Sequence, residues 1–387
     1  MKDLEDIWIA GLGMVSPAGL GTDGLLDAYR SGAHKLVYDE ELEAWIGRLE
    51  KSAGRIDAFI RLPYARLDPT THYAIFAARR ATEQANWQTD PKDYGILIGS
   101  SRGATTIWEA EHRQFLEAGQ ASPFASPTTT LGNISSWVGQ DLGQRGFRSS
   151  HSVTCSTAAH ALVQAVAWLR VGMAERMLIG GAEAPLTTFT LAQMRAMRIY
   201  SRASSLAEWP CTPLGSGRAT GMVLAEGAGA LALERGRPKN ALAQIAGLGY
   251  AQEKLESPTG IDPAGSGIAQ AMRMALQSAG LDRVDLVITH APGTAKGDAA
   301  EWAALKAVFG DTMPLIANTK WMQGHGLGAS AAWSLGLAIA AMNSDEGLPG
   351  LPYSSAIDQP QRKIVPESAL VNAMGFGGNC VSILLIL

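Results

Sequence analysis

Cysteine is scarce in this sequence, with only three residues, Cys155, Cys211 and Cys380, in a chain of 387. Their number is odd, and no two of them stand in a Cys-x-x-Cys spacing. This pattern excludes a disulfide framework and argues against a zinc site. We therefore expect a chain that is held together by an apolar core and that binds no metal.

Charged side chains are also few, at 18% of the residues, and the formal net charge is -4. Nucleic acids and anionic membranes attract proteins through clustered positive charge. The charge balance of this chain therefore indicates neither of these partners. It is compatible with a local basic patch that binds an acidic protein.

Little in the sequence would direct the chain into or across a membrane. Its first residues, MKDLEDIW, are acidic where a signal peptide is basic. The apolar stretch 382–387 is far too short to span a bilayer and predicts a buried strand instead. We therefore predict a cytoplasmic protein without a membrane partner.

Glycine and apolar residues are plentiful, at 43 glycines and 47% hydrophobic residues. Short apolar runs bounded by glycine alternate with stretches rich in Ala and Leu, which predicts an α/β fold with buried strands. We expect strands near 7–13, 94–100, 176–184, 221–234, 241–250, 284–291, 313–320 and 369–378, and helices near 156–175, 266–279, 298–309 and 327–343.

Two of these runs, 7–13 and 241–250, contain the same Gly-Leu-Gly triplet, which indicates an internal duplication. No linker separates the halves, so we expect them to share one core. The first triplet, with Gly11 and Gly13, also begins like a dinucleotide-binding loop. Ser16 stands where that loop needs its third glycine, so we interpret the triplet as a tight strand-to-helix turn.

Cys155 is the first candidate for chemistry. The stretch 152–154 predicts a strand that leads into it, and an Ala-rich helix is predicted directly after it. The partial positive charge at a helix N-terminus stabilises a thiolate. A buried, inert cysteine is the alternative interpretation. The order of strand, cysteine and helix favours a nucleophile.

Two histidines, a lysine and a glycine-rich turn are the further candidates. His290 ends a predicted strand, where α/β folds place their active sites. Lys320 ends another strand, and His325 follows it in a glycine-rich turn. The stretch 372–379 (NAMGFGGN) either presents backbone amides as donors or is simply a tight turn between two strands.

Other polar residues near these candidates have structural interpretations. Asp298 and Glu301 have the spacing of a capping box at the start of a predicted helix. His160 falls within the helix that follows the cysteine, where we expect a histidine of the core.

Together, these motifs resemble those of the elongating β-ketoacyl-[acyl carrier protein] synthases of the thiolase superfamily. The resemblance covers essentially the whole chain and includes IWIAGLGMVSPAG, GGAEA, LAEGAGALALE, the pattern TKxMxGHxLGA and the turn GFGG. It implies a thiolase fold with a duplicated five-layer α-β-α-β-α arrangement. The N-terminal half would be residues 1–240, and the C-terminal half would be residues 241–387.

The resemblance also implies a role for each candidate in a decarboxylative Claisen condensation of fatty-acid, polyene or polyketide-type biosynthesis. Cys155 matches the nucleophile that accepts an acyl group from the phosphopantetheine of acyl carrier protein. His290 and His325 match paired neutral histidines that donate hydrogen bonds to a malonyl thioester and favour its decarboxylation. The amides of Cys155 and Phe376 match the oxyanion hole.

Supporting roles follow from the same resemblance. Lys320 matches a lysine that organises the site by pairing with Glu301. Thr294 matches a threonine that contacts pantetheine, and Arg66 matches one basic position of the carrier-protein docking surface. No bound cofactor is expected, because the phosphopantetheine arrives with acyl carrier protein. The second implied partner is another ketosynthase-like chain, in a homodimer or a heterodimer.

Two departures from the family pattern stand out. The family segment His-Gly-Thr-x-Thr is replaced by HAPGT, and two alignments compete. The ungapped alignment, which we prefer, puts His290 on the catalytic histidine, whereas the other puts Pro292 there. Arg102 falls where the family has a small or apolar residue near the acyl pocket, so it would shorten that pocket or make its end polar.

Two alternative functions stay open. A chain-length-factor subunit, which pairs with a synthase without condensing, would explain Pro292 and Arg102 but not the retained Cys155. A degradative thiolase would use a second cysteine near the C-terminus as its base, and Cys380 lies there. Cys380 aligns instead with a structural asparagine of the synthases.

Overall fold

The computed structural model describes residues 7–49, 64–89, 92–217, 219–355, 357 and 363–387. In this part, the main sheet contains two sets of five strands, and corresponding strands of the two sets occupy the same positions in the spatial order. The N-terminal set runs β6 (Arg148–Ser149), β5 (Gly95–Gly99), β7 (Arg176–Glu183), β8 (Gly227–Arg235) and β1 (Ile7–Ser16). The C-terminal set runs β11 (Leu315–Ala317), β10 (Leu286–Ile288), β12 (Ser368–Gly375), β13 (Asn379–Ile386) and β9 (Ala243–Gln252).

The strand directions also repeat between the two sets. The first three strands of each set are mutually parallel, and the last two are each antiparallel to the strand before. The sets meet where Trp8 pairs with Gln244 and Ile9 pairs with Ala243. The internal duplication that the Gly-Leu-Gly triplets predict is therefore present in the fold.

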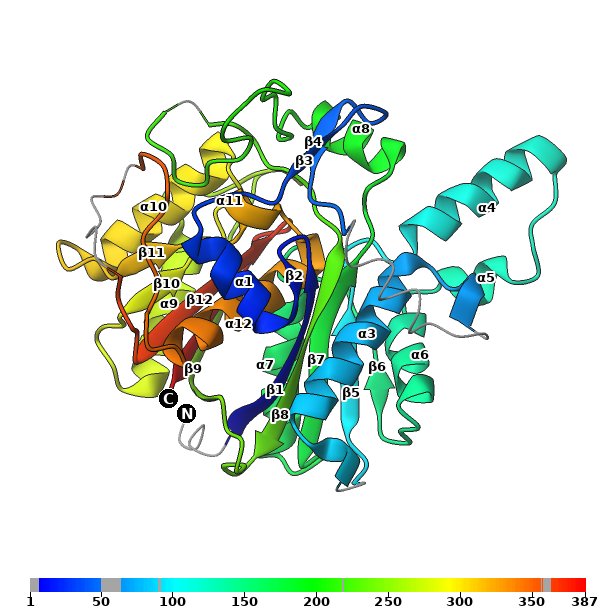
Figure 1. Cartoon of the computed structure of the whole chain (residues 1–387). Helices are drawn as coiled ribbons and strands as arrows, with labels where there is room; N and C mark the ends of the chain where they lie inside the picture. Colours follow the sequence, from blue (N-terminus) through cyan, green and yellow to red (C-terminus); the bar gives the residue numbers. More distant parts are fainter. Residues whose placement is uncertain (1–6, 50–63, 90–91, 218, 356, 358–362) are drawn as a thin grey trace.

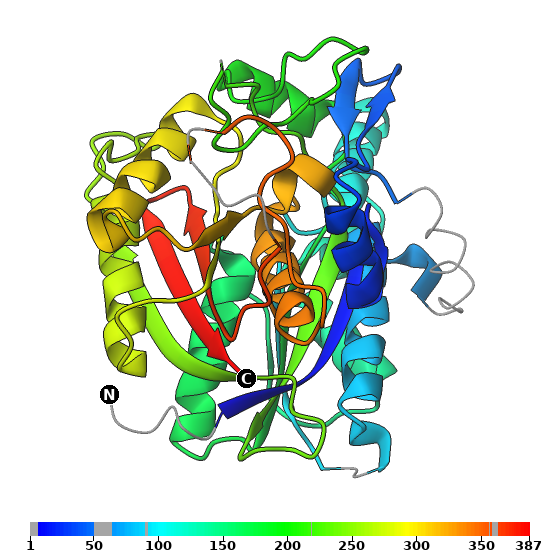
Figure 2. The same cartoon turned by 60° about the vertical axis from the view of Figure 1, so that its left-hand side comes forward.

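Helices form three layers around the two strand sets (Figures 1 and 2). In the middle, α7 (Thr157–Arg170) and α12 (Ser330–Met342) contact strands of both sets. The outer face of the N-terminal set is covered by α3 (Pro69–Gln84) and α6 (Asn133–Asp141), and that of the C-terminal set by α9 (Ser266–Ala279) and α10 (Ala295–Phe309). This arrangement confirms the five-layer thiolase fold.

The sequences of these elements explain their places. Helix α12 (SAAWSLGLAIAAM) has no charged side chain and is buried along almost its whole length, as a helix that is apolar all round must be. A Cβ atom on Gly13 would collide with the Ala77 carbonyl oxygen of α3, and one on Gly249 with the Ala271 carbonyl oxygen of α9. The Gly-Leu-Gly triplets therefore permit close packing of a helix on a strand in both halves. The interpretation of the first triplet as a strand-to-helix turn is wrong, because Gly11 and Gly13 lie inside β1.

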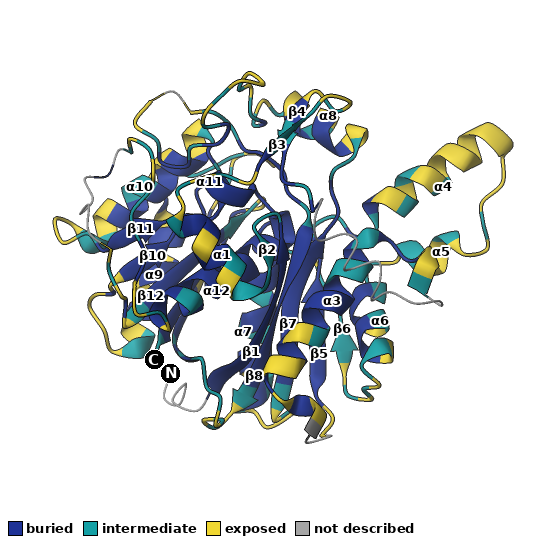
Figure 3. Ribbon diagram, in the orientation of Figure 1, coloured by how far each residue is buried: buried dark blue, intermediate teal, exposed yellow. Residues whose placement is uncertain are grey.

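Smaller elements lie around this core. They are α1 (Gly21–Arg30), β2 (Gly19–Leu20), β3 (Val37–Asp39), β4 (Ala44–Ile46), η1 (Tyr64–Arg66), η2 (Trp87–Thr89), α8 (Thr188–Ala196), α11 (Lys320–Gln323) and η3 (Leu327–Ala329). Two further helices, α4 (Thr105–Ala118) and α5 (Ala125–Thr129), form an arm that projects from the body (Figure 1) and is largely exposed (Figure 3). Among the helices of the described ranges, none has the length and apolar character needed to cross a membrane.

Candidate active site

Cys155 lies directly before α7, as the sequence predicts, but residues 152–154, which lead into it, form a tight turn and not the predicted strand. Thr154 adopts a φ of 49°, which is uncommon for a residue other than glycine. The hydroxyl of Thr157 donates to the Thr154 carbonyl at 2.7 Å, and that of Ser156 donates to the Val153 carbonyl at 2.8 Å. These bonds hold the cysteine at the start of the helix, where it is only 8% exposed.

Burial dominates the electrostatics of the Cys155 thiol. It raises the pKa of this thiol to about 12, and the charge of Glu183 acts in the same direction. The cation of Lys320 lowers the pKa, by less. Burial thus favours the protonated thiol, and it acts against the partial positive charge at the helix N-terminus, which favours the thiolate.

His290 and His325 come together from two separate segments. Their ring centroids lie 5.4 Å apart with an interplanar angle of 79°, and both residues are buried. Burial, together with the cation of Lys320, lowers the pKa of both imidazoles well below its usual value. Both rings are therefore neutral at physiological pH. The Nδ1 atom of His325 lies 2.8 Å from the hydroxyl oxygen of Ser330.

Glu301, from α10, holds the His290 loop in place. Its carboxylate accepts hydrogen bonds from the backbone amides of His290 at 2.9 Å and Ala291 at 2.5 Å. The side-chain amide of Asn372, on β12, donates to the same carboxylate at 3.0 Å. A carboxylate with three donors is well suited to fix the backbone on which a catalytic ring is carried.

Lys320 begins α11 and is almost completely buried. Burial lowers the pKa of its ammonium group to about 8, whereas Glu301, Cys155 and Cys211 act in the opposite direction. The expected direct pair with Glu301 is not among the ion pairs of the described residues. The two groups therefore attract each other over a longer distance. The carboxylate oxygens of Glu301 instead accept hydrogen bonds from the His290 loop.

The HAPGT segment places His290, and not Pro292, against the ring of His325. The carbonyl oxygen of Pro292 faces the thiol of Cys211, with a sulfur-to-oxygen distance of 3.7 Å. Thr294 is the N-cap residue of α10 and is half-buried. The geometry therefore agrees with the ungapped alignment of this segment.

The predicted capping box of Asp298 and Glu301 is wrong. Asp298 lies inside the first turn of α10, and its carboxylate accepts from the amides of Gly293 at 3.0 Å, Thr294 at 3.1 Å and Leu214 at 2.8 Å. Burial raises the pKa of this carboxyl to about 7. Asp298 thus ties the loop after His290 to a distant segment, a contact that local spacing does not reveal.

The glycine-rich turn between β12 and β13 packs on the turn that carries the cysteine. The hydroxyl of Thr154 donates to the Phe376 carbonyl at 3.4 Å, and a Cβ atom on Gly375 would collide with that hydroxyl. Phe376 itself is 38% exposed. The backbone at Cys155 and the backbone at Phe376 are therefore neighbours, although they lie in different halves of the chain.

Three predicted residues lie apart from this cluster. The Nδ1 atom of His160 lies 3.1 Å from the Ser156 carbonyl oxygen one helical turn earlier, a structural contact within α7. The thiol of Cys380 faces Glu253 at 3.9 Å and packs near α9. Arg66 stacks on the ring of Phe124, 4.2 Å from its centroid.

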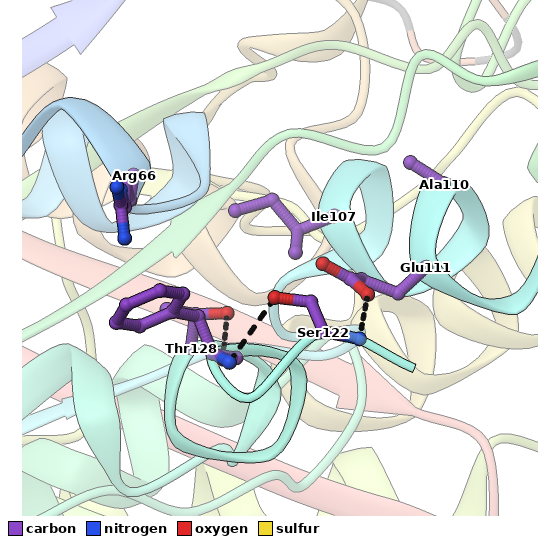
Figure 4. Close-up of a pocket in the computed structure, with 7 residues that line it drawn as sticks. Arg66, Ile107, Ala110, Glu111, Ser122 and Thr128 are labelled. Atoms are coloured by element: carbon purple, nitrogen blue, oxygen red, sulfur yellow. Dashed lines mark hydrogen bonds between the residues drawn. The ribbon is translucent and has the colours of Figure 1, made fainter. Parts of the chain in front are cut away.

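Arg66 and Phe124 line a cleft of about 390 Å³ at the base of the arm, together with Ile107 and Glu111 (Figure 4). The cleft is formed by α4, α5 and the 3-10 helix η1. It belongs to the surface of the arm, and none of its lining residues is among those that gather around the cysteine and the two histidines.

Sequence patterns did not single out two buried groups that belong to the site. Glu183, the last residue of β7, is completely buried, and its charge acts on the Cys155 thiol. Cys211 acts on Lys320 and faces the HAPGT loop. A carboxylate at the end of the apolar run RMLIGGAE is the feature that could have identified Glu183, because a buried carboxylate needs specific partners.

Two family models match the chain. Residues 4–238 match the model described as beta-ketoacyl synthase, N-terminal domain, and residues 242–353 match the model of the C-terminal domain. A 3-oxoacyl-[acyl-carrier-protein] synthase 2 of Staphylococcus aureus (strain MRSA252) is 30% identical over 81% of the chain and 80% of its own length. The corresponding protein of Vibrio harveyi is 28% identical over 96% of the chain and 95% of its own length.

Solved structures share the fold at lower identity. A beta-ketoacyl synthase from Burkholderia phymatum superposes with a TM-score of 0.86 at 23% identity, over 98% of this chain and 99% of that chain. A type II polyketide ketosynthase structure, determined in complex with its acyl-carrier protein, superposes with a TM-score of 0.85 at 22% identity, over 98% and 99%. A ketosynthase from Xenorhabdus doucetiae in complex with its chain length factor gives 0.78 at 20% identity, over 99% and 98%.

Proposed function

The chain belongs to the β-ketoacyl synthase family, and on this premise we propose that it condenses malonyl-[acyl carrier protein] with an acyl group held as a thioester on Cys155. The observation that carries the proposal is that the charge of Lys320 acts on three buried groups, which are the Cys155 thiol before α7 and the paired rings of His290 and His325. Acyl transfer, decarboxylation and carbon–carbon bond formation divide among these residues.

In the first half-reaction, the sulfur of Cys155 attacks the thioester carbon of an acyl carrier protein. The new carbon–sulfur bond forms, the old one breaks, and the thiol proton leaves with the pantetheine sulfur. The backbone amides of Cys155 and Phe376 donate to the oxyanion of the tetrahedral intermediate. The packing of the Phe376 turn on Thr154 supports this role, and one such donor contributes roughly 10²–10³ in rate.

In the second half-reaction, the neutral rings of His290 and His325 donate to the thioester oxygen of the malonyl group. Loss of carbon dioxide leaves an enolate, whose carbon attacks the acyl thioester on Cys155 and releases its sulfur as a thiolate. A proton from solvent then restores the thiol. A neutral ring suits this task because one nitrogen carries the N–H that donates while the other accepts a hydrogen bond that orients the ring. When the Ser330 hydroxyl donates to Nδ1 of His325, the ring carries its proton on Nε2, the atom left for the substrate.

Lys320, Glu301 and Thr294 have supporting roles in this proposal. The cation of Lys320 helps to keep both histidines neutral. Glu301 positions the His290 loop through its two backbone hydrogen bonds. Thr294, half-buried at the start of α10, contacts the pantetheine arm of the carrier. Acyl carrier protein is thus a partner that supplies phosphopantetheine only as a carrier of the substrate, and the enzyme needs no bound cofactor.

We further propose that a second ketosynthase-like chain, identical or related, covers the arm. One side of α4 exposes Trp108, Phe115 and Leu116, at 54%, 50% and 70%, and Phe189 of α8 is 55% exposed. Helices α4 and α8 are joined by a hydrogen bond of 2.7 Å from the Thr187 hydroxyl to Glu109. Exposed apolar side chains in such numbers are typical of an interface.

The proposal is tested by incubating the protein with acyl carrier protein loaded with an acyl group and measuring the intact mass of the enzyme. The wild type should gain the mass of one acyl group, and Cys155→Ala should gain none. Cys380→Ala is the matched control, since it removes another buried cysteine that lies near α9, and it should acylate as the wild type does. Full acylation of Cys155→Ala would overturn the assignment.

A chain-length-factor subunit that does not condense is the second candidate, and the placement of Arg102 among buried groups favours it. The retention of Cys155, His290 and His325 in one site argues for an active synthase. The two are separated by turnover of malonyl-[acyl carrier protein] by the purified chain alone. If turnover requires a co-purified synthase with its own cysteine, this chain is the chain-length-factor subunit.

A further inference from the structure

Glu183 is a buried carboxylate with one oxygen satisfied and the other free. Its Oε1 atom accepts hydrogen bonds from the backbone amide of Ser101 and from that of Gly328, the latter at 3.1 Å. Its Oε2 atom has no hydrogen-bond partner in the described part of the chain. Hydrogen bonding from the Ser100 side chain helps to lower the pKa of this carboxyl, although the two groups do not reach the distance and angle of a fully formed hydrogen bond. The free oxygen is an acceptor inside the protein.

Arg102 supplies the complementary donor. It follows Ser101, whose amide binds Glu183, and its positive charge acts on that carboxylate. Its Nη2 atom donates to the Gln193 side chain of α8 at 2.5 Å. Its Nε atom is buried and has no hydrogen-bond partner among the described residues. A buried N–H donor and a buried carboxylate oxygen are therefore left free on neighbouring groups.

This pair borders the surroundings of Cys155. The charge of Glu183 acts on the Cys155 thiol, and Gly328, which donates to Glu183, packs against Thr157 in the first turn after the cysteine. Gln193 lies on α8 between Leu191 and Met194, which share an apolar cluster with Cys155. Cys155 therefore has both apolar side chains and this polar pair in its surroundings.

We propose that the acyl group accepted by Cys155 carries a hydroxyl, which donates to Oε2 of Glu183 and accepts from Nε of Arg102. This inference rests on the proposed function and names its substrate class. A hydroxyl satisfies both groups at once, because it is donor and acceptor in one atom. A plain alkyl chain leaves both unpaired, and an ionised carboxylate faces repulsion from Glu183.

The test compares pantetheine thioesters of equal chain length. One carries a plain acyl chain, and the members of a series each carry one hydroxyl, at successive carbons. The measured quantity is the rate constant of Cys155 acylation at limiting thioester, followed by intact mass. We expect one position of the hydroxyl to raise this rate constant about tenfold to a hundredfold over the plain chain. Arg102→Leu and Glu183→Gln should each lower that ratio towards one.

The outcomes separate the two proposals. Acylation at equal rates by the plain chain and by every member of the hydroxyl series would overturn the hydroxyl subsite and leave the synthase proposal standing. An absence of acylation by all of them would overturn both. A preference that persists undiminished in Arg102→Leu and Glu183→Gln would also overturn the subsite. If either variant fails to fold, the comparison of plain and hydroxylated thioesters on the wild type still tests the hydroxyl subsite.

Discussion

In the reaction that we propose, Cys155 starts as a thiol whose pKa burial raises to about 12. The same burial lowers the pKa of His290 and His325, so that all three groups are uncharged. An uncharged site suits chemistry in which negative charge appears only in the tetrahedral intermediate and the enolate. Donors that are fixed before the reaction then stabilise that charge without reorganisation.

The paired histidines should be needed for decarboxylation and not for acyl transfer. We expect His325→Ala to accept an acyl group on Cys155 while its release of carbon dioxide from malonyl carrier protein falls about 10²–10⁴-fold, the usual contribution of a positioned side chain. Labelled carbon dioxide and intact mass measure the two steps. His160→Ala is the control, since the hydrogen bond of the His160 ring goes to the backbone of its own helix, and it should retain both. Undiminished decarboxylation by His325→Ala would refute the assignment.

Glu183 should make stability depend on pH. Burial raises its pKa from 4.5 to about 7, so its contribution to stability is complete below pH 4.5 and is lost as the pH rises through 7. Glu183→Gln keeps the shape and removes the titration. From pH 4.5 to pH 8, the stability of the wild type relative to this variant should fall by up to about 3 kcal/mol. Urea unfolding at both pH values measures the free energies of unfolding of the two proteins. The same difference between wild type and variant at both pH values would contradict the prediction.

At the scale of the element, the loop after β10 is held by the helix that follows it. Glu301 and Asp298 both point back from α10, and between them they accept from the amides of His290, Ala291, Gly293 and Thr294. The carboxylates therefore set the course of HAPGT regardless of the proline within it. This explains how the segment keeps a histidine against His325 despite its departure from the family pattern.

The packing of β1 on α3 should be sensitive to a single methyl group. A Cβ atom at Gly13 would collide with the backbone of Ala77, which cannot move without shifting the helix. We expect Gly13→Ala to destabilise the protein by about 1–3 kcal/mol, as overpacking does. Gly132→Ala, where a Cβ meets nothing within 4 Å, is the control and should be nearly neutral. Denaturant unfolding compares them, and equal midpoints for the two variants would disprove the account.

At the scale of the molecule, the candidate active site is built from residues of both duplicated halves. Cys155 comes from the N-terminal strand set, whereas His290, Lys320, His325 and Phe376 come from the C-terminal one. The middle helices α7 and α12 contact both sets, so the nucleophile and the histidines meet only when the two halves share their central layer. Neither half alone holds all the residues to which we assign a role in the proposed reaction.

The arm should carry the contact with a second chain. We expect the wild type to behave as a dimer and the double variant Phe115→Arg, Leu116→Arg to behave as a monomer, because two buried charges would oppose the interface. Light scattering during gel filtration measures the mass. Leu206→Arg, at a 93% exposed loop position outside the arm, is the control and should stay dimeric. A monomeric wild type, or an unchanged mass in the double variant, would refute the interface.

Local pattern was sufficient for much of this protein. The apolar runs and the Ala-rich stretches predict the main strands and helices, including a helix at 266–279 that matches α9. Cys155 at a helix start, and the histidines after buried strands, also follow from neighbouring residues alone. These features could be predicted because periodicity and chain order are local properties.

What the tertiary structure decided depends on burial and on contacts between distant segments. Burial, which no local pattern measures, favours the protonated thiol of Cys155. Contacts across the chain turn Asp298 from a helix cap into a tie to Leu214 and keep Lys320 out of direct contact with Glu301. The sequence alone thus determined which residues stand at the ends of strands and helices. The fold decided their charge and their partners, because both depend on which segments exclude water together.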